Sequence, residues 1–264
     1  MGVHVNRLRE RAAEHALEKA ANPEASGVCP YAGHQSEDKS IYETLMRDDR
    51  VSNDLCANII MALFRTGIDS TGNAMAFFLY NLANNPDKQQ LLYEEIQSNL
   101  PGKTPLTMEA LNNMPYMKAC LRESFRLHFP VFGGSGRVLS KDITFSGYNI
   151  PQGTFIFANL AAMSRMEEYY PRPLEYHPER WLRDDRADMG AIWPSEAGFL
   201  SLPFSHGLRA CPGKRFAEQS LYLAVATILQ NFRLEYHGET MGMIHMPFTQ
   251  PDKPLDINFI PRED

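Results

Sequence analysis

One cysteine-containing stretch, residues 202–216 with the sequence LPFSHGLRACPGKRF, constrains this chain more than any other. Cys211 lies in a turn rich in glycine and proline, and an apolar helical pattern begins directly after it. The unpaired N–H groups and the dipole of a first helical turn favour the thiolate form at such a position. A lone cysteine is otherwise more often a small buried hydrophobe, by roughly ten to one. Its neighbours therefore decide the interpretation.

Five residues of this stretch have the spacing F-x-x-G-x-R-x-C-x-G: Phe204, Gly207, Arg209, Cys211 and Gly213. The spacing resembles the heme-binding signature of the cytochromes P450. The resemblance implies that Cys211 is the axial thiolate on the iron of heme b, that Arg209 contacts a heme propionate, and that Phe204 packs beside the sulfur. The chain has Ser205 where the family often has glycine, which predicts a local change in the loop without loss of heme.

A long helix is predicted over residues 53–84, with glycine and hydroxyl residues in its middle. A packing glycine with helix-bending hydroxyls is one explanation for these locally unfavourable residues. The segment TGIDST also resembles the oxygen-activation segment of the P450 I helix. That resemblance implies that Gly67 opens a groove for O2, that Asp69 is the acid of a proton relay, and that Ser70 is its alcohol, with Thr71 beside it. Serine keeps the hydroxyl of the family's threonine without its stiffening methyl group.

A second long helix is predicted over residues 115–128, where Glu123 and Arg126 are three positions apart and share a face. An ordinary surface ion pair, worth about 1 kcal/mol or less, is one interpretation. The pair also resembles the E-x-x-R motif of the P450 K helix. Arg180, in the segment HPERW, then supplies the third member of the family's buried Glu-Arg-Arg network. Because removal of one member strands a buried charge, Glu123→Ala is predicted to give protein without heme.

The segments between and after these motifs allow only approximate predictions of secondary structure. Residues 131–136 are predicted as a flexible turn, and residues 137–159 as short strands with turns at 146–147 and 151–153. By resemblance, Arg137 pairs with a heme propionate, and Val131, Phe132 and Gly133 face the substrate. Residues 183–201 are predicted to be irregular and residues 255–260 to form a last strand. A helix over residues 214–232 is predicted to bury one apolar set: Phe216, Leu221, Leu223, Ile228 and Leu229.

Composition excludes several classes of protein. The 264 residues are 44% hydrophobic and 22% charged, as in a soluble globular chain of one large or two small domains. The net charge of -6 and the absence of a lysine-arginine tract disfavour nucleic acid as a partner. The four cysteines, Cys29, Cys56, Cys120 and Cys211, show no C-x-x-C spacing, which disfavours a disulfide framework and a zinc site. A reducing compartment fits them better.

The resemblance covers essentially the whole chain but only the C-terminal half of the P450 fold. We therefore expect residues 1–264 to form a partial P450 domain, mainly α with small β-sheets, whose heme loop is residues 202–213. A truncated gene model, a fragment or an isoform is the simplest explanation. A further helix is predicted at residues 6–22 and a loop at 23–40. No signal peptide, presequence or spanning segment is recognised, so membrane association is expected only through the absent half.

Two phrases, PRPLEYHPERWLR and CPGKRFAE, resemble the animal mitochondrial P450s, which receive electrons from an acidic adrenodoxin-type ferredoxin. That resemblance implies ferredoxin docking on Lys118, Arg122, Lys214 and Arg215, although such charges usually mark no more than a solvated helix face. It also implies the matrix side of the mitochondrial inner membrane as the location, with the endoplasmic reticulum membrane as the alternative.

The expected activity is that of a heme-thiolate monooxygenase, which inserts one oxygen atom from O2 into a lipophilic, steroid-like organic substrate. Two alternatives remain open. An oxygen-independent heme-thiolate isomerase or dehydratase would tolerate the serine at position 70, and NADPH-dependent oxygen consumption through a ferredoxin pair distinguishes it from a monooxygenase. A non-catalytic fragment is the other alternative.

Overall fold

The computed structural model describes residues 44–45, 48, 51–131, 134–182, 197–246 and 248–263. The helix and loop predicted within residues 6–40 lie outside the described residues. The chain forms two compact units, Met1–Ile68 and Asp69–Asp264, and the long helix α3 (Asn53–Ala83) contributes residues to both. Within the first unit, the described part is mainly the first half of α3, where Cys56 is buried.

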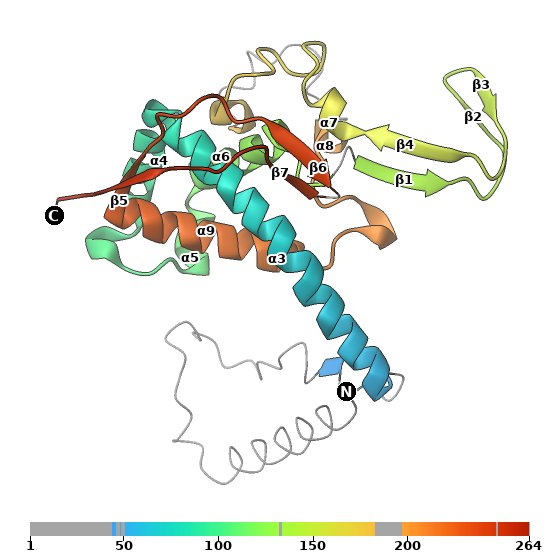
Figure 1. The fold of residues 1–264 in the computed structure, drawn as a ribbon, viewed down its shortest axis with the longest axis horizontal. Coiled ribbons are helices and arrows are strands. Elements are labelled where there is room, and N and C mark those ends of the chain that lie inside the picture. Colours follow the sequence, from blue (N-terminus) through green and yellow to red (C-terminus); the bar gives the residue numbers. More distant parts are fainter. Residues whose placement is uncertain are drawn as a thin grey trace, which may run out of the picture. The chain divides into compact units, whose positions relative to one another are not determined.

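Helices make up nearly half of the described part of the second unit and far more of it than strands do (Figure 1). The α-helices after α3 are α4 (Pro86–Asn99), α5 (Met108–Asn112), α6 (Pro115–Leu127), α7 (Leu160–Met163), α8 (Ala197–Leu200) and α9 (Lys214–Asn231). The 3-10 helices are η2 (Pro101–Lys103), η3 (Pro178–Trp181) and η5 (Gly207–Arg209). Helices α3, α6 and α9 each end one residue before the predicted end. The prediction of an irregular segment up to residue 201 was wrong at α8, where 197–200 form one helical turn.

Proline marks the beginnings of two of the α-helices. Pro86 is the first residue of α4 and Pro115 the first residue of α6. A proline is tolerated there because the N–H that it lacks would have no partner within the helix, and because its fixed φ angle suits the first turn. The sequence position of each proline therefore determines where each helix starts.

The apolar core of the second unit lies among α3, α4, α6 and α9. The contributing side chains, all nearly inaccessible to solvent, include Phe78 and Leu82 of α3, Leu92 and Ile96 of α4, Met117 and Leu121 of α6, and Leu221, Val225 and Leu229 of α9. Their spacing of three or four residues places each set on one helix face. The prediction that Phe216 and Leu223 also point inward was wrong, since both are exposed. At about 100° per residue they lie on the far side of α9 from Leu221.

The β-structure consists of antiparallel pairs (Figure 1). The pairs are β1 (Gly134–Val138) with β4 (Phe155–Asn159), β2 (Ile143–Phe145) with β3 (Tyr148–Ile150), β5 (Phe232–Glu235) with β8 (Asn258–Pro261), and β6 (Met243–Met246) with β7 (Phe248–Pro251). Ser146 and Gly147 both have positive φ, 48° and 81°, as a two-residue hairpin turn between twisted strands requires. The prediction of a flexible turn over residues 131–136 was wrong from Gly134 onward, because β1 begins there.

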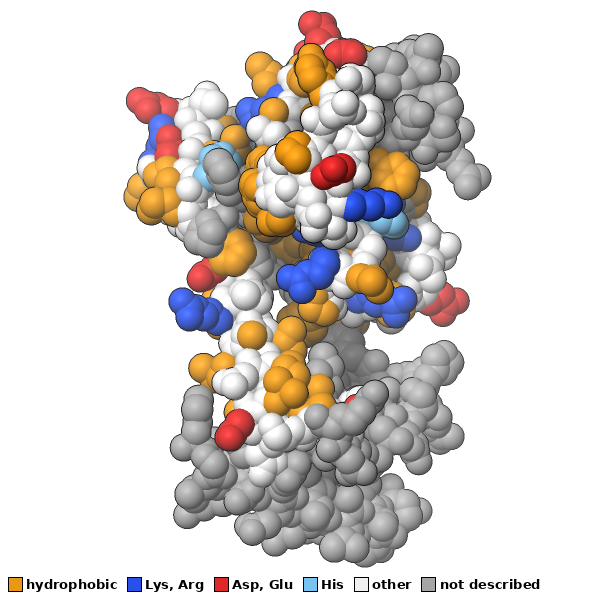
Figure 2. All heavy atoms as spheres, turned by 90° about the vertical axis from the view of Figure 1, so that its right-hand side faces the viewer, with side chains coloured by type: hydrophobic (Ala, Val, Ile, Leu, Met, Phe, Trp, Pro, Cys, Tyr) orange, Lys and Arg blue, Asp and Glu red, His pale blue; other side chains and the backbone are white. Residues whose placement is uncertain are grey.

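The architecture confirms the predicted fold class, which is mainly α with small β-sheets. None of the helices in the described residues combines the length and the apolar character needed to cross a membrane. Hydrophobic and charged side chains both reach the surface on the face that Figure 2 shows.

Candidate functional site

The loop before α9 holds Cys211 in a defined backbone geometry. The Cys211 N–H donates to the carbonyl oxygen of Phe204 at 2.9 Å, and the N–H of Ala210 donates to Gly207 O at 3.0 Å. Gly207 has a φ of 77° and Ser205 a φ of 61°. Positive φ is easily adopted by glycine but costs energy at serine. The family's usual glycine at position 205 would relieve this local strain, which gives the sequence departure at Ser205 a structural consequence.

Phe204 connects the cysteine loop to α6. Its ring meets the ring of the buried Phe125 edge to face, with centroids 5.4 Å apart and an interplanar angle of 89°. Edge-to-face contacts of this kind add stability beyond the area that they bury. Because the Phe204 carbonyl also accepts the Cys211 N–H, packing against α6 fixes the position of the cysteine backbone.

The residues around Cys211 fit a heme as the group that the loop would hold. The Cys211 thiol is free and exposed, and a Cβ built at Gly213 would lie 3.8 Å from its sulfur, so the sulfur is close to the backbone that leads into α9. A heme iron would take a single ligand from this loop, the Cys211 thiolate, whereas zinc needs three or four protein ligands. No group of three His, Cys, Asp or Glu suited to a metal ion occurs among the described residues.

Apolar side chains near Cys211 are also exposed. Leu208 is fully exposed and Phe216 is 74% exposed. Exposed apolar groups that are close together usually mark a surface that another molecule covers. A porphyrin over the cysteine loop would cover such a surface.

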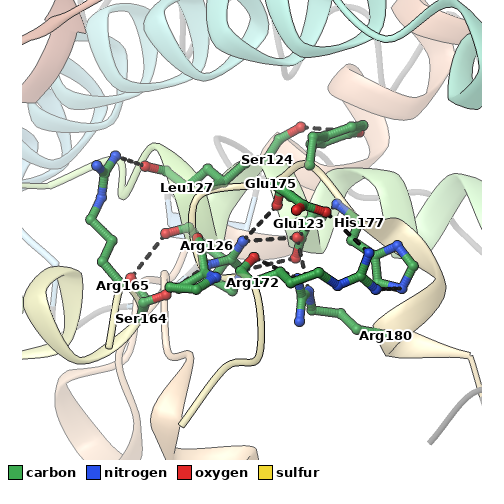
Figure 3. A network of polar contacts seen from close by, with 12 residues as sticks. Glu123, Ser124, Arg126, Leu127, Ser164, Arg165, Arg172, Glu175, His177 and Arg180 are labelled. Carbon is green, nitrogen blue, oxygen red and sulfur yellow. Dashed lines mark hydrogen bonds and ion pairs between the residues drawn. The ribbon is translucent and has the colours of Figure 1, made fainter. Parts of the chain in front are cut away.

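Glu123, Arg126 and Arg180 meet in one buried network (Figure 3). Glu123 Oε1 accepts from Arg126 Nη2 at 2.9 Å and from Arg180 Nε at 2.9 Å, while Oε2 accepts from Arg126 Nε at 2.9 Å. The side chains of Glu123 and Arg126 are 0% exposed and that of Arg180 is 1% exposed. The exposed ion-pair interpretation of the Glu123–Arg126 spacing is therefore wrong.

Backbone carbonyls satisfy the remaining guanidinium donors. Arg126 Nη1 donates to Ser164 O at 2.6 Å and to Pro173 O at 2.7 Å. Arg180 Nη1 donates to Pro171 O at 3.0 Å. A buried charge is tolerable only when its hydrogen-bonding groups are paired in this way. The network thus connects α6 and η3 to the irregular segment between α7 and η3.

Sequence reasoning missed two contacts of this network. Trp181 Nε1 donates to Glu123 Oε2 at 2.9 Å, and the His177 N–H donates to Glu123 Oε1 at 3.0 Å. The adjacency of Trp181 to Arg180 in HPERW was the only sequence signal for the first contact. The second is made by a backbone group, so no side-chain pattern could have indicated it.

Burial changes the acid–base behaviour of groups around the network. Desolvation lowers the pKa of Arg180, and the Glu123 carboxylate opposes that change. Desolvation raises the pKa of Tyr170 to about 12, and the Tyr170 ring lies 5.1 Å from the Arg126 guanidinium carbon. Burial favours the neutral form of each group. The carboxylate of Glu123 is thus the group that keeps two buried guanidinium ions compatible with the fold.

The residues predicted to activate oxygen lie in the middle of α3, across the boundary of the two units. In the first unit, a Cβ built at Gly67 would meet no atom of the described residues within 4 Å, so these residues give no support to a packing role for this glycine. Thr66 Oγ1 donates to Ala62 O at 2.8 Å, as in the helix-bending explanation. In the second unit, Asp69 is exposed, while Ser70 and Thr71 are partly exposed.

The predicted heme and substrate contacts occupy three elements. Arg209 ends η5 and Arg137 lies on β1, opposite Ile156 of β4, and both arginines are exposed. Val131 is 39% exposed and forms a β-bridge with Phe248. Phe132 and Gly133 lie outside the described residues.

The four predicted docking residues lie on α6 and α9. Arg122, Lys214 and Arg215 are exposed, and Lys118 is partly exposed. Lys118 Nζ donates to Asn112 O at 3.4 Å, which keeps this ammonium near the end of α5. Lys214 Nζ lies 4.0 Å from Glu218 Oε1. Glu218 is acidic, so the surface that carries these four basic residues also contains a carboxylate.

Comparison with known proteins agrees with the motifs. The family model for cytochrome P450 matches residues 8–259. The chain is 36% identical over 232 residues to "Probable cytochrome P450 12c1, mitochondrial" of Drosophila melanogaster, covering 86% of this chain and 43% of that protein. It is 38% identical over 200 residues to "Cytochrome P450 302a1, mitochondrial" of the same species, covering 74% and 39%.

A third relative, cytochrome P450 3A25 of Mus musculus, is 35% identical over 213 residues, covering 80% of this chain and 41% of that protein. The chain therefore spans about two-fifths of the length of these relatives. The family match over nearly the whole chain, and identities above 30% in proteins from a fly and a mouse, lead to one conclusion: the chain belongs to the cytochrome P450 family.

Proposed function

We propose that this chain is part of a heme-thiolate monooxygenase that inserts one oxygen atom from O2 into a lipophilic, steroid-like substrate. The observation that carries the proposal is the exposed thiol of Cys211 at the start of α9, in a loop anchored to α6 through Phe204. When bound, heme b would supply the redox chemistry that activates O2.

Each part of the proposed site has its own task. Cys211 Sγ would ligate the iron, and the guanidinium groups of Arg209 and Arg137 would each pair with a propionate carboxylate as charge-assisted hydrogen bonds. The Asp69 carboxyl and the Ser70 hydroxyl would hold and pass protons toward the oxygen-binding face, since an acid next to an alcohol can relay them. Val131, with Phe132 and Gly133, would contact the substrate.

We further propose that an adrenodoxin-type ferredoxin supplies the electrons and that the protein works in mitochondria. The positive charges of the exposed Arg122, Lys214 and Arg215 and of the partly exposed Lys118 support an acidic partner, because complementary charge accelerates encounter and selects partners. The fly relatives named above carry the word mitochondrial in their names, which supports the location.

The carbon monoxide difference spectrum of the reduced, heme-loaded protein tests the ligand. A strongly red-shifted Soret band is expected, because the family's thiolate ligation produces it. Cys211→Ser should abolish this band, since a hydroxyl does not replace a thiolate ligand. Cys120→Ala is the matched control, because Cys120 is buried in the core and its loss should leave the band in place.

Two results would contradict the proposal. A red-shifted band that survives Cys211→Ser would remove Cys211 as the ligand. A normal band without NADPH-dependent, substrate-dependent oxygen consumption, when ferredoxin and its reductase are supplied, would favour an oxygen-independent isomerase or dehydratase over a monooxygenase.

A further inference from the structure

The basic surface of α6 and α9 contains an acidic residue, Glu218, one helical turn after Lys214. Glu218 Oε1 lies 4.0 Å from Lys214 Nζ, and the two side chains are 29% and 55% exposed. The carboxylate is thus less accessible than the ammonium that it faces. A residue at this spacing lies on the same helix face as Lys214, so Glu218 belongs to the surface that includes the proposed docking residues.

Arg122 of α6 acts on the same carboxylate. Burial raises the pKa of Glu218, while the positive charges of Lys214 and Arg122 oppose this rise. The neighbouring Tyr222 is buried, and the negative charge of Glu218 contributes to its raised pKa. Two of the four proposed docking residues, Arg122 of α6 and Lys214 of α9, therefore act electrostatically on the Glu218 carboxylate.

Lys214 also contacts the cysteine loop. Its Nζ lies 5.8 Å from the ring centroid of Phe204, and the Phe204 carbonyl accepts the Cys211 N–H at 2.9 Å. A cation over an aromatic face is held by the ring's quadrupole. The Lys214 ammonium thus already has a carboxylate and an aromatic ring as neighbours, and a partner's carboxylate that pairs with it must share it with Glu218.

We propose that Glu218 is a specificity-determining residue of this surface: its carboxylate competes with an acidic redox partner for Lys214 and so weakens docking. This inference rests on the proposed ferredoxin partner. An acidic protein approaching the surface is repelled by Glu218 and must also compete with it for Lys214. Only a partner with several suitably placed carboxylates overcomes both effects, so Glu218 selects against weakly acidic proteins.

Binding of recombinant adrenodoxin to the heme-loaded protein tests the inference, with Kd measured at about 20 mM and about 300 mM salt, where the Debye length falls severalfold. Glu218→Gln keeps the shape of the side chain and removes its charge, so Kd should fall about threefold to tenfold at low salt and by less at high salt. Glu218→Ala should change Kd in the same direction. Glu218→Asp retains the charge and should bind more weakly than either neutral variant.

Glu239→Gln is the matched control, because Glu239 is an exposed carboxylate paired with Lys253 at 3.2 Å, outside α6 and α9. It makes the same change in net charge, and its Kd should stay within about twofold of the unmodified protein, since Glu239 pairs with Lys253 and not with a docking residue. Unchanged or weaker binding in both neutral Glu218 variants would overturn the inference. Absence of adrenodoxin binding by the unmodified protein at either salt concentration would instead overturn the proposed partner on which the inference rests.

Discussion

Glu123 bonds both buried arginines, Arg126 and Arg180, so its removal leaves their charges without this carboxylate in the core. Its two oxygens accept three guanidinium hydrogen bonds, the Trp181 indole N–H and the His177 N–H. Glu123→Ala should therefore lower the free energy of unfolding by about 3–5 kcal/mol, the usual cost of breaking a buried ion pair. We also expect loss of heme, because α6 supports Phe204 and thereby the cysteine loop. Urea unfolding and the heme content of the purified variant measure the two effects.

The exposed pair Arg172–Glu175 provides the control. It has the same three-residue separation and a 3.1 Å contact, but its side chains are 58% and 59% exposed. Glu175→Ala should cost less than about 1 kcal/mol, as exposed ion pairs do, and should retain heme. Equal destabilisation by the two variants would show that burial of the Glu123 network does not determine its contribution.

His128 makes stability depend on pH. Its ring is 9% exposed and stacks on Phe77 with centroids 4.3 Å apart, and Nδ1 lies 3.2 Å from Asn81 Nδ2. Burial, with the charges of Arg165 and Arg126, lowers its pKa from 6.5 to about 3. Between these values the unfolded chain binds a proton at this site and the folded chain does not. Stability should therefore fall as pH drops below 6.5, by up to about 1.4 kcal/mol per pH unit.

His128→Gln should flatten this dependence, because glutamine does not titrate. Urea unfolding between pH 7 and pH 5 gives the slope, in a range where most carboxylates remain ionised. His237→Gln is the control, since the His237 side chain is 70% exposed and its removal should leave the slope nearly unchanged. The same slope in His128→Gln as in the unmodified protein would mean that another group accounts for the pH dependence.

At the scale of elements, α6 depends on a carboxylate from α4 for its first turn. The residue before α6, Met114, provides no side-chain cap. Glu95 Oε1 accepts the Tyr116 N–H and Oε2 accepts the Met117 N–H, both at 2.8 Å. An acceptor for unpaired N–H groups at a helix start is worth about 1–2 kcal/mol. Glu95→Ala should lose this amount in chemical unfolding.

Glu94 provides a neighbouring comparison on the exposed side of α4. Its carboxylate accepts from Gln90 Nε2 at 2.9 Å, one turn earlier in the same helix. Glu94→Ala makes the same substitution in the same helix without touching α6, so its cost should be about 0.5 kcal/mol or less. If the two variants lose equal stability, the capping of α6 by Glu95 contributes nothing.

The elements also show how far sequence reasoning extends. Prolines and apolar spacing are local signals, and they placed the ends of α3, α6 and α9 within one residue of those observed. Partners distant in sequence left no local signal: Glu95 is 21 residues from Tyr116, and Trp181 is 58 residues from Glu123. The exposure of Phe216 and Leu223 was missed for a related reason. Which apolar face of α9 is buried depends on α4 and the other helices of the core, not on α9 alone.

For the whole molecule, the motifs of the proposed site come from segments far apart in sequence, and packing within the second unit brings several of them together. The Glu123 network and the Phe204–Phe125 contact are formed within the second unit. The oxygen-activation segment spans the boundary of the two units, so its relation to Cys211 stays a prediction of the family resemblance. Within the second unit, the fold leaves the Cys211 thiol of the cysteine loop accessible to solvent.

That accessibility leads to a prediction about the thiols. Cys56 and Cys120 are buried, whereas Cys211 is exposed. In protein carrying Cys29→Ser, one thiol should react rapidly with a maleimide under native conditions, and two more should react only after unfolding. Peptide mass mapping should identify the fast thiol as Cys211. Heme loading should slow this reaction at least about tenfold, because an iron-bound thiolate is neither exposed nor free to attack. Rapid labelling of Cys211 in fully heme-loaded protein would mean that the heme is held by another ligand, whereas protection that disappears when heme is extracted would place the iron on this sulfur.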